Sequence, residues 1–100
     1  LYADAAIAPP PGQDFDALPP FLQRSEGRVR WALRFDTPER HAESVRNYHR
    51  LIQGVDDSVG EIVQALRRTG RARDTVIVFL GDNGCFLGEH GLGDKWLLYE

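Results

Sequence analysis

A short apolar segment at residues 75–80 runs directly into a Gly-Asp-Asn-Gly motif at residues 81–84. The segment is rich in β-branched side chains and carries no charge, which is typical of a strand that is buried on both faces. Such strands lie in sheets that helices cover, so the segment predicts an α/β protein. In open α/β sheets, ligands bind just beyond the carboxyl ends of the strands. We therefore expect a functional site at the motif.

Asp82 and Asn83 place a carboxylate and a carboxamide side by side, with a glycine before and after them. Two oxygen donors on a tight, bare backbone suit a hard cation such as Ca²⁺ or Mg²⁺. The alternative is a hairpin turn, because Asn-Gly is the strongest short signal for a two-residue turn. Residues 85–88 are short and bounded by glycine, which makes a poor return strand. The spacing of an EF-hand is absent.

Size and charge narrow the class of protein. The chain has 100 residues, enough for one small domain at most, and its 42% hydrophobic and 27% charged residues indicate a globular protein rather than a disordered one. The net charge is −3 and no basic cluster dominates, so neither nucleic acid nor a membrane is expected as the main partner. The chain contains no methionine and stops within an apolar-rich stretch, so we expect it to be a piece of a longer protein.

Residues 1–36 are predicted to form an irregular segment that packs on a surface. Prolines at positions 9–11 and 19–20 interrupt regular structure, while apolar residues such as Phe15 and Trp31 favour packing over a free linker. Recognition of the prolines by a partner protein is the alternative.

A long helix is predicted over residues 37–70. Thr37 and Pro38 are typical of a helix start, and Gly70 is typical of a helix end. Apolar side chains recur between them at spacings of three and four and form one stripe: Val45, Tyr48, Ile52, Val55, Val59, Ile62 and Leu66. A coiled-coil seam is the alternative, but further apolar residues widen the stripe, as in a helix that packs on a sheet.

Glycines recur through residues 81–95, which predicts a loop that lets its backbone approach a ligand closely. Lys95, at the end of this loop, can neutralise an oxyanion, although an exposed surface lysine is the ordinary alternative. His90 fits a proton donor, a partner of a ligand or a plain loop histidine. Cys85 is more typical of a small buried hydrophobic residue than of a nucleophile.

These motifs, taken in order, resemble the type I sulfatases. The resemblance extends over about residues 46–100. It rests on residues 76–84, Leu87-Gly88-Glu89-His90-Gly91, Lys95-Trp96 and Tyr99-Glu100, and on a helix pattern with Tyr48, Val55-Asp56-Asp57, Val59-Gly60 and Leu66.

The resemblance implies an alkaline-phosphatase-like α/β fold, of which this chain would be a fragment. It implies one divalent cation, usually calcium, with Asp82 and Asn83 matching two of its ligands, and it matches Lys95 to a lysine that contacts sulfate. His90 belongs to a motif common in bacterial members, and no role carries over to it. The implied reaction is hydrolysis of a small-molecule or sugar sulfate ester to an alcohol and sulfate.

The nucleophile of the family is not found in this chain. Sulfatases attack sulfur with a formylglycine made within a Cys/Ser-x-Pro/Ala-x-Arg signature, and the residues after Cys85 do not match it. The resemblance therefore implies that formylglycine lies upstream of Leu1 and that this piece alone is inactive. A phosphoester or phosphonate-ester hydrolase of the same superfamily is the nearest rival. Its members often carry Asp-His at the position of Asp82-Asn83, so the asparagine favours sulfate. A non-catalytic calcium-binding or helical interaction module is the rival from another class.

Overall fold

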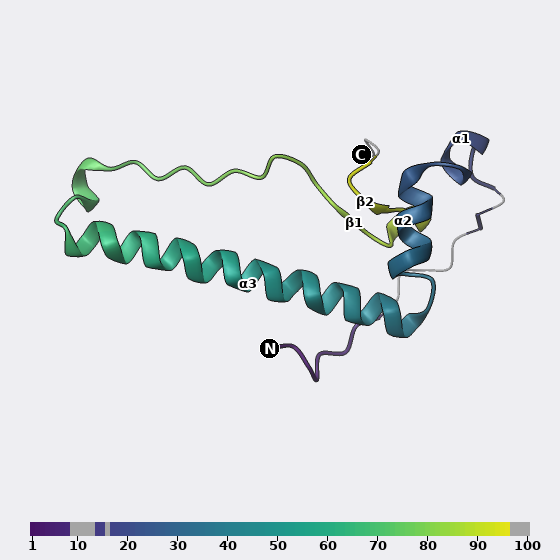
Figure 1. Ribbon diagram of the computed structural model, residues 1–100, viewed down its shortest axis with the longest axis horizontal. Coiled ribbons are helices and arrows are strands. Elements are labelled where there is room, and N and C mark those ends of the chain that lie inside the picture. The colour runs from purple at the N-terminus through teal and green to yellow at the C-terminus, as the bar shows by residue number, and fades with distance from the viewer. Residues whose placement is uncertain (9–13, 16, 97–100) are drawn as a thin grey trace.

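The computed structural model describes residues 1–8, 14–15 and 17–96. The molecule is elongated, measuring 58 × 32 × 18 Å, because one long helix follows most of its length (Figure 1). It is rich in helix, with a single small two-stranded sheet among the described residues. The prolines at positions 9–11 and the pair Tyr99-Glu100, both used in the sequence analysis, lie outside the described residues. No described helix combines the length and the apolar character that a membrane crossing needs.

The long helix, α3, spans Pro38–Arg68, close to its predicted bounds. The Thr37 hydroxyl caps its start by accepting a hydrogen bond from the amide three residues on, at 3.2 Å. Gly70 follows the helix with φ at 71°, and the amides of Gly70 and Arg71 donate to carbonyls of the last turn. A glycine ends the helix because it takes this left-handed conformation at little cost.

Two helices occupy the segment that we predicted to be irregular, and that prediction is wrong for them. They are α1, Pro20–Gln23, and α2, Glu26–Arg34. Ser25 caps α2 by accepting a hydrogen bond from a backbone amide in the first turn, at 3.2 Å. An ion pair one turn apart, between Glu26 and Arg30 at 2.8 Å, adds support along the helix surface.

The strand predicted at residues 75–80 does not form among the described residues. After a 3₁₀ turn at Ala72–Asp74, these residues run extended back along α3 without joining a sheet, as the green stretch of Figure 1 shows. All six are exposed, with Val76 at 88% and Leu80 at 81%. A strand needs a hydrogen-bonded neighbour, and the described residues supply none. Of the seven residues in the apolar stripe of α3, Ile52, Val55 and Ile62 are exposed as well, and the other four are partly buried.

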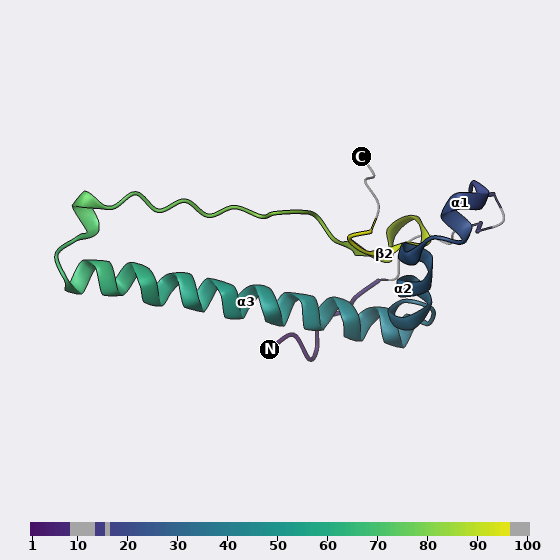
Figure 2. The same ribbon diagram turned by 45° about the horizontal axis from the view of Figure 1, so that its top comes forward.

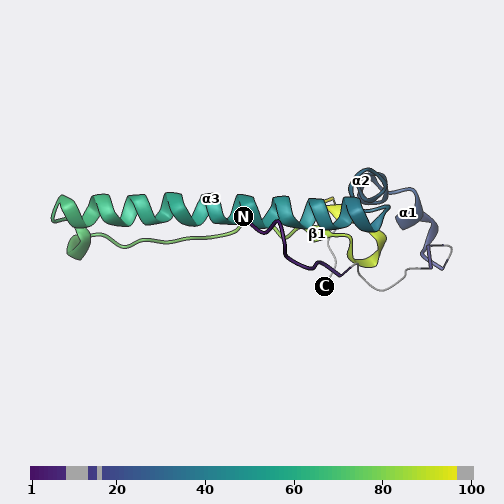
Figure 3. The same cartoon turned by 90° about the horizontal axis from the view of Figure 1, so that it is seen from below.

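The packed part of the molecule lies at the N-terminal end of α3. Here β1, Phe86–Leu87, pairs antiparallel with β2, Gly93–Asp94, and β2 lies against α2. Leu92 and Phe35 form the small core, at 1% and 7% exposure. Figures 2 and 3 show that α2 and this hairpin share one end of α3, while only the extended segment accompanies the other end.

Candidate functional site

Asp82 and Asn83 stand where the extended segment meets the packed end, and both side chains are exposed. The side-chain amide of Asn83 donates a hydrogen bond from Nδ2 to the carbonyl oxygen of Gly84, at 2.8 Å. The strand that follows, β1, pairs with β2 and not with residues 75–80. The hairpin interpretation of Asn83-Gly84 is therefore wrong.

These two residues fit part of a cation site. The Nδ2 of Asn83 donates to the backbone, which leaves its side-chain oxygen available as an acceptor. Calcium takes about six to eight oxygen ligands, so two donors make an incomplete set. Within the described part of the chain, no group of three or more His, Cys, Asp or Glu side chains gathers to hold a metal ion. Water or residues outside this part would have to complete the shell.

The glycine-rich loop that follows is shaped by close contact with the rest of the protein. The Phe15 ring occupies the place where a Cβ at Gly91 would lie. A Cβ at Gly93 would lie 2.9 Å from the backbone nitrogen of Trp31 in α2. We predicted that the loop glycines bring backbone close to a ligand. For Gly91 and Gly93 the close neighbour is instead the protein itself.

An aromatic and cationic cluster supports this loop from the N-terminal segment. The rings of Phe15 and Trp31 meet edge to face with centroids 4.8 Å apart. The guanidinium carbon of Arg28 lies 3.5 Å from the Phe15 ring centroid and 4.1 Å from that of Trp31. Burial lowers the pKa of Arg28. Sequence reasoning placed Phe15 and Trp31 on a surface but had no signal that this surface is the loop.

His90 packs within the loop and carries no sign of a catalytic role. It lies inside a 3₁₀ turn at Glu89–Gly91 with φ at 56°, and its ring stands nearly perpendicular to that of Phe86, 6.3 Å away. The Glu89 carboxylate accepts a hydrogen bond from the Leu87 amide at 2.7 Å, which ties the same turn to β1. We assign no function to His90.

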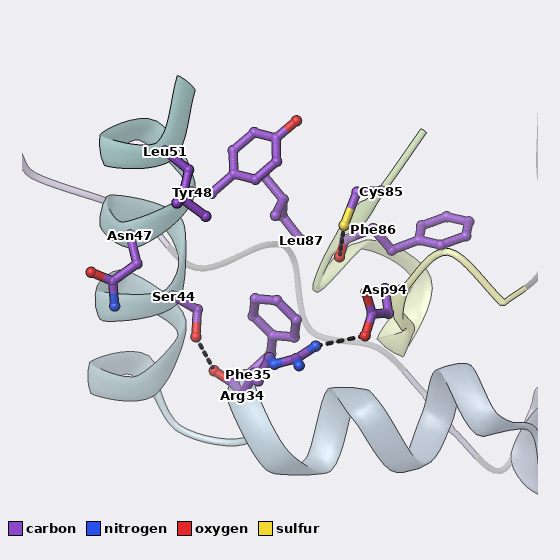
Figure 4. Close-up of a pocket in the computed structure, with 10 residues that line it drawn as sticks. All are labelled: Arg34, Phe35, Ser44, Asn47, Tyr48, Leu51, Cys85, Phe86, Leu87 and Asp94. Atoms are coloured by element: carbon purple, nitrogen blue, oxygen red, sulfur yellow. Dashed lines mark hydrogen bonds and ion pairs between the residues drawn. The ribbon is translucent and has the colours of Figure 1, made fainter. Parts of the chain in front are cut away.

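Lys95 directly follows β2 and its side chain is exposed. The residue before it, Asp94, forms an ion pair with Arg34 of α2, with Oδ2 2.7 Å from Nη1. The pair borders a pocket of about 390 Å³ between α3, the end of α2 and the hairpin, as Figure 4 shows. Arg34 is a residue that sequence reasoning missed, because no local pattern links it to a position so far along the chain.

Cys85 lines this pocket, and nearby charged side chains affect the pKa of its thiol. Its pKa is raised, first by burial and then by the negative charges of Asp94 and Glu89, while Arg34 and Lys95 oppose the rise. A raised pKa keeps the thiol protonated and therefore weakly nucleophilic.

The β1–β2 pair joins the two halves of the candidate site. Asn83 shortly precedes β1, and Lys95 directly follows β2. Because Phe86 pairs with Asp94, the chain leaving the cation-ligand pair and the chain leading to the lysine run side by side. The structure therefore links the predicted cation ligands to the predicted anion-binding lysine through one short ladder.

Comparison with known proteins gives a consistent result. A family model described as Sulfatase matches residues 6–100. The chain is 36% identical over 61 residues to an N-acetylglucosamine-6-O-sulfatase of Bacteroides thetaiotaomicron, a match that covers 61% of the chain and 11% of that protein. It is 40% identical over 67 residues to a choline-sulfatase of Rhizobium meliloti, covering 66% of the chain and 13% of the relative.

A third relative is an arylsulfatase of Klebsiella aerogenes, 37% identical over 51 residues, with 48% of the chain and 11% of that protein covered. The chain thus spans little more than a tenth of the length of the curated relatives it matches. No solved structure matches the chain significantly.

Proposed function

The chain belongs to the sulfatase family, and from this membership we propose that it is part of an enzyme that hydrolyses a sulfate monoester to an alcohol and sulfate. The relatives named above are all sulfatases, though of different substrates. The observation that carries the proposal is the ladder that links Asp82 and Asn83 to Lys95. The ladder connects the proposed metal ligands to the Lys95 ammonium. A metal ion and an ammonium group that lie close together can both bind one sulfate group.

In the complete enzyme the chain is one part of an alkaline-phosphatase-like domain, and residues 75–80 are a strand of its sheet. The exposed apolar side chains of this segment and of α3 support this, because burying apolar surface stabilises by roughly 25 cal/mol per Å². The small share of the relatives' length that the chain spans also supports it. Other parts of the protein would pair with the segment and cover the stripe.

Asp82 and Asn83 hold a divalent cation, and calcium suits their oxygen donors best. The bound cation supplies positive charge that stabilises the oxygens of the sulfate group. Asn83 presents its side-chain oxygen because its nitrogen is already bonded to the backbone. Both residues directly follow the carboxyl end of the extended segment, which is where ligands bind in open α/β sheets.

Lys95 binds the sulfate group from the other side of the ladder. Its ammonium neutralises a sulfate oxygen and favours the charge that develops on the leaving oxygen. The nucleophile, a formylglycine in this family, lies outside these residues. Cys85 does not replace it, since its surroundings keep the thiol protonated.

The test uses the complete protein, with 4-nitrophenyl sulfate as substrate and metal content measured by mass spectrometry. Asp82→Ala should lower bound calcium and activity together. Lys95→Ala should lower kcat/KM by about 100-fold while the metal content stays at one ion, because it removes one preorganised charge contact. Asp74→Ala, in the 3₁₀ turn that precedes the same extended segment, is the control that should change neither.

Three outcomes would contradict the proposal. Turnover of 4-nitrophenyl phosphate but not of the sulfate would favour the phosphoester rival. Full activity in Asp82→Ala would remove that carboxylate from the site. Loss of calcium in Lys95→Ala would mean that the lysine supports the cation site rather than the anion.

A further inference from the structure

Arg34 reaches the residue next to the proposed sulfate-binding lysine from a distant part of the sequence. It is the last residue of α2, and its Nη1 lies 2.7 Å from Oδ2 of Asp94. Both side chains are partly exposed. Their contact, drawn as a dashed line in Figure 4, links α2 to the end of β2, one residue before Lys95.

Asp94 has an uncommon backbone conformation that its ion pair helps to hold. Its φ is 71°, in the left-handed region that a residue with a Cβ rarely adopts. Such a conformation persists where the surroundings hold it, and it tends to occur at functional sites. The backbone at Asp94 sets the direction in which Lys95 leaves the strand. A change in the Asp94 conformation would therefore turn the lysine away.

Arg34 is itself held in place. The Ser44 hydroxyl of α3 donates a hydrogen bond to the Arg34 carbonyl at 3.0 Å, which fixes the end of α2 against α3. On the other side, the contact of Gly93 with the α2 backbone fixes the position of β2 along the helix. These contacts set where the strand lies, and the ion pair of Arg34 with Asp94 then sets how its last residue is turned.

We propose that Arg34 is a positioning residue for Lys95, which through its ion pair with Asp94 aims the lysine at the sulfate group. This rests on the proposed function of Lys95. An exposed ion pair contributes little to global stability. Its loss should therefore appear in the binding of the anion and in KM much more than in the melting temperature, which separates this role from a merely structural one.

The experiment measures Lys95 directly, in the complete calcium-loaded protein. Acetic anhydride labels the exposed amine, mass spectrometry follows Lys95, and inorganic sulfate is added as the probe that protects it. In Arg34→Ala the sulfate concentration for half protection should rise about tenfold, and KM for 4-nitrophenyl sulfate should rise by a similar factor. Arg34→Lys, which keeps a charge but not the planar geometry, should recover part of the effect.

The matched control is Arg40→Ala. Arg40 pairs with Asp36 at 2.9 Å, is similarly exposed and lies near the same helix junction, and its ion pair joins two residues one helical turn apart rather than α2 and the hairpin. It should stay within twofold of the wild type in both measurements. Asp94→Asn keeps a side chain that tolerates the left-handed region but removes the charge, so it should weaken protection as Arg34→Ala does, and the double variant should be no worse than either single change.

The outcomes separate two failures. If sulfate does not protect Lys95 in the wild type, the proposed function of the lysine is wrong and this inference is wrong with it. If sulfate protects Lys95 equally in the wild type and in Arg34→Ala, Lys95 binds the anion but Arg34 does not position it. Equal weakening in Arg34→Ala and Arg40→Ala would also overturn the inference, since it would reflect overall charge.

Discussion

The two ends of α3 differ in what packs against them. At the N-terminal end, α2, Phe15 and the β1–β2 hairpin pack on one another and bury Leu92 at 1% exposure. Further along α3, the helix and residues 75–80 face each other across a hollow of about 310 Å³, which is lined by Ile52, Val55, Asp56, Val59 and Phe79. The first region is specified by this chain's own residues. The second has the apolar side chains of a core, but no element among the described residues covers them.

The same difference divides the candidate site. Lys95 leaves a strand that α2 holds through Gly93 and Arg34, so its direction is set within the chain. Asp82 and Asn83 end a segment with no ladder partner among the described residues, so their direction depends on what that segment pairs with. In our proposal, Lys95 is preorganised by contacts within this chain, while Asp82 and Asn83 depend on a supporting sheet.

The largest expected effect comes from placing a charge in the apolar segment. In the complete protein, Ile77→Asp and Val78→Asp should each lower the free energy of unfolding by about 3 kcal/mol or more, because an unpaired charge would be buried. In the isolated chain, where Val78 is 71% exposed, each change should cost less than about 0.5 kcal/mol. Urea unfolding followed by circular dichroism measures both.

The pair of variants also sharpens the comparison. Neighbouring residues of a strand point to opposite faces of the sheet. A strand covered on both faces predicts damage from both changes, and a strand covered on one face predicts damage from one. Two harmless changes in the complete protein would mean that residues 75–80 stay exposed there, and the sheet that we propose would be wrong.

A smaller effect is expected at the packed end, and it should not depend on the rest of the protein. Gly93→Ala would set a Cβ 2.9 Å from the Trp31 backbone nitrogen and 3.1 Å from the Arg30 carbonyl carbon, and backbone cannot move aside cheaply. Overpacking of this kind should lower the unfolding free energy by about 1–3 kcal/mol. The loss should be equal in the isolated chain and the complete protein.

Gly84→Ala is the control for this change, because a Cβ there meets nothing within 4 Å. It should leave the unfolding free energy within about 0.5 kcal/mol of the wild type. If Gly93→Ala proved as harmless as the control, the hairpin would not sit on α2 as closely as described, and the support for Lys95 would weaken with it.

The sequence predicted the features that depend on local signals and missed those that depend on contacts with distant residues. The bounds of α3 depend on local signals, a cap at Thr37 and a left-handed stop at Gly70, and local signals can be read from one sequence. The cap of α2 at Ser25 is an equally local signal, but the nearby prolines favoured an irregular segment instead. The burial of residues 75–80 could not be settled, because a strand's surroundings come from other strands. The contact of Arg34 with Asp94 is purely tertiary and leaves no pattern in the sequence.

The smallest expected effect is a change in stability whose sign should differ between the isolated chain and the complete protein. Gly60 lies inside α3, and a Cβ there meets nothing within 4 Å. In the isolated chain, Gly60→Ala should therefore stabilise the helix by about 0.5–1 kcal/mol through helix propensity alone. In the complete protein, a sheet packed on the stripe would crowd the new methyl group, and the same change should be neutral or destabilising. Gly70→Ala should destabilise in both settings, since its φ of 71° disfavours any Cβ. Stabilisation by Gly60→Ala of equal size in both would mean that this stretch of α3 stays uncovered, and the far end of the helix would then be a solvated face rather than half of a core.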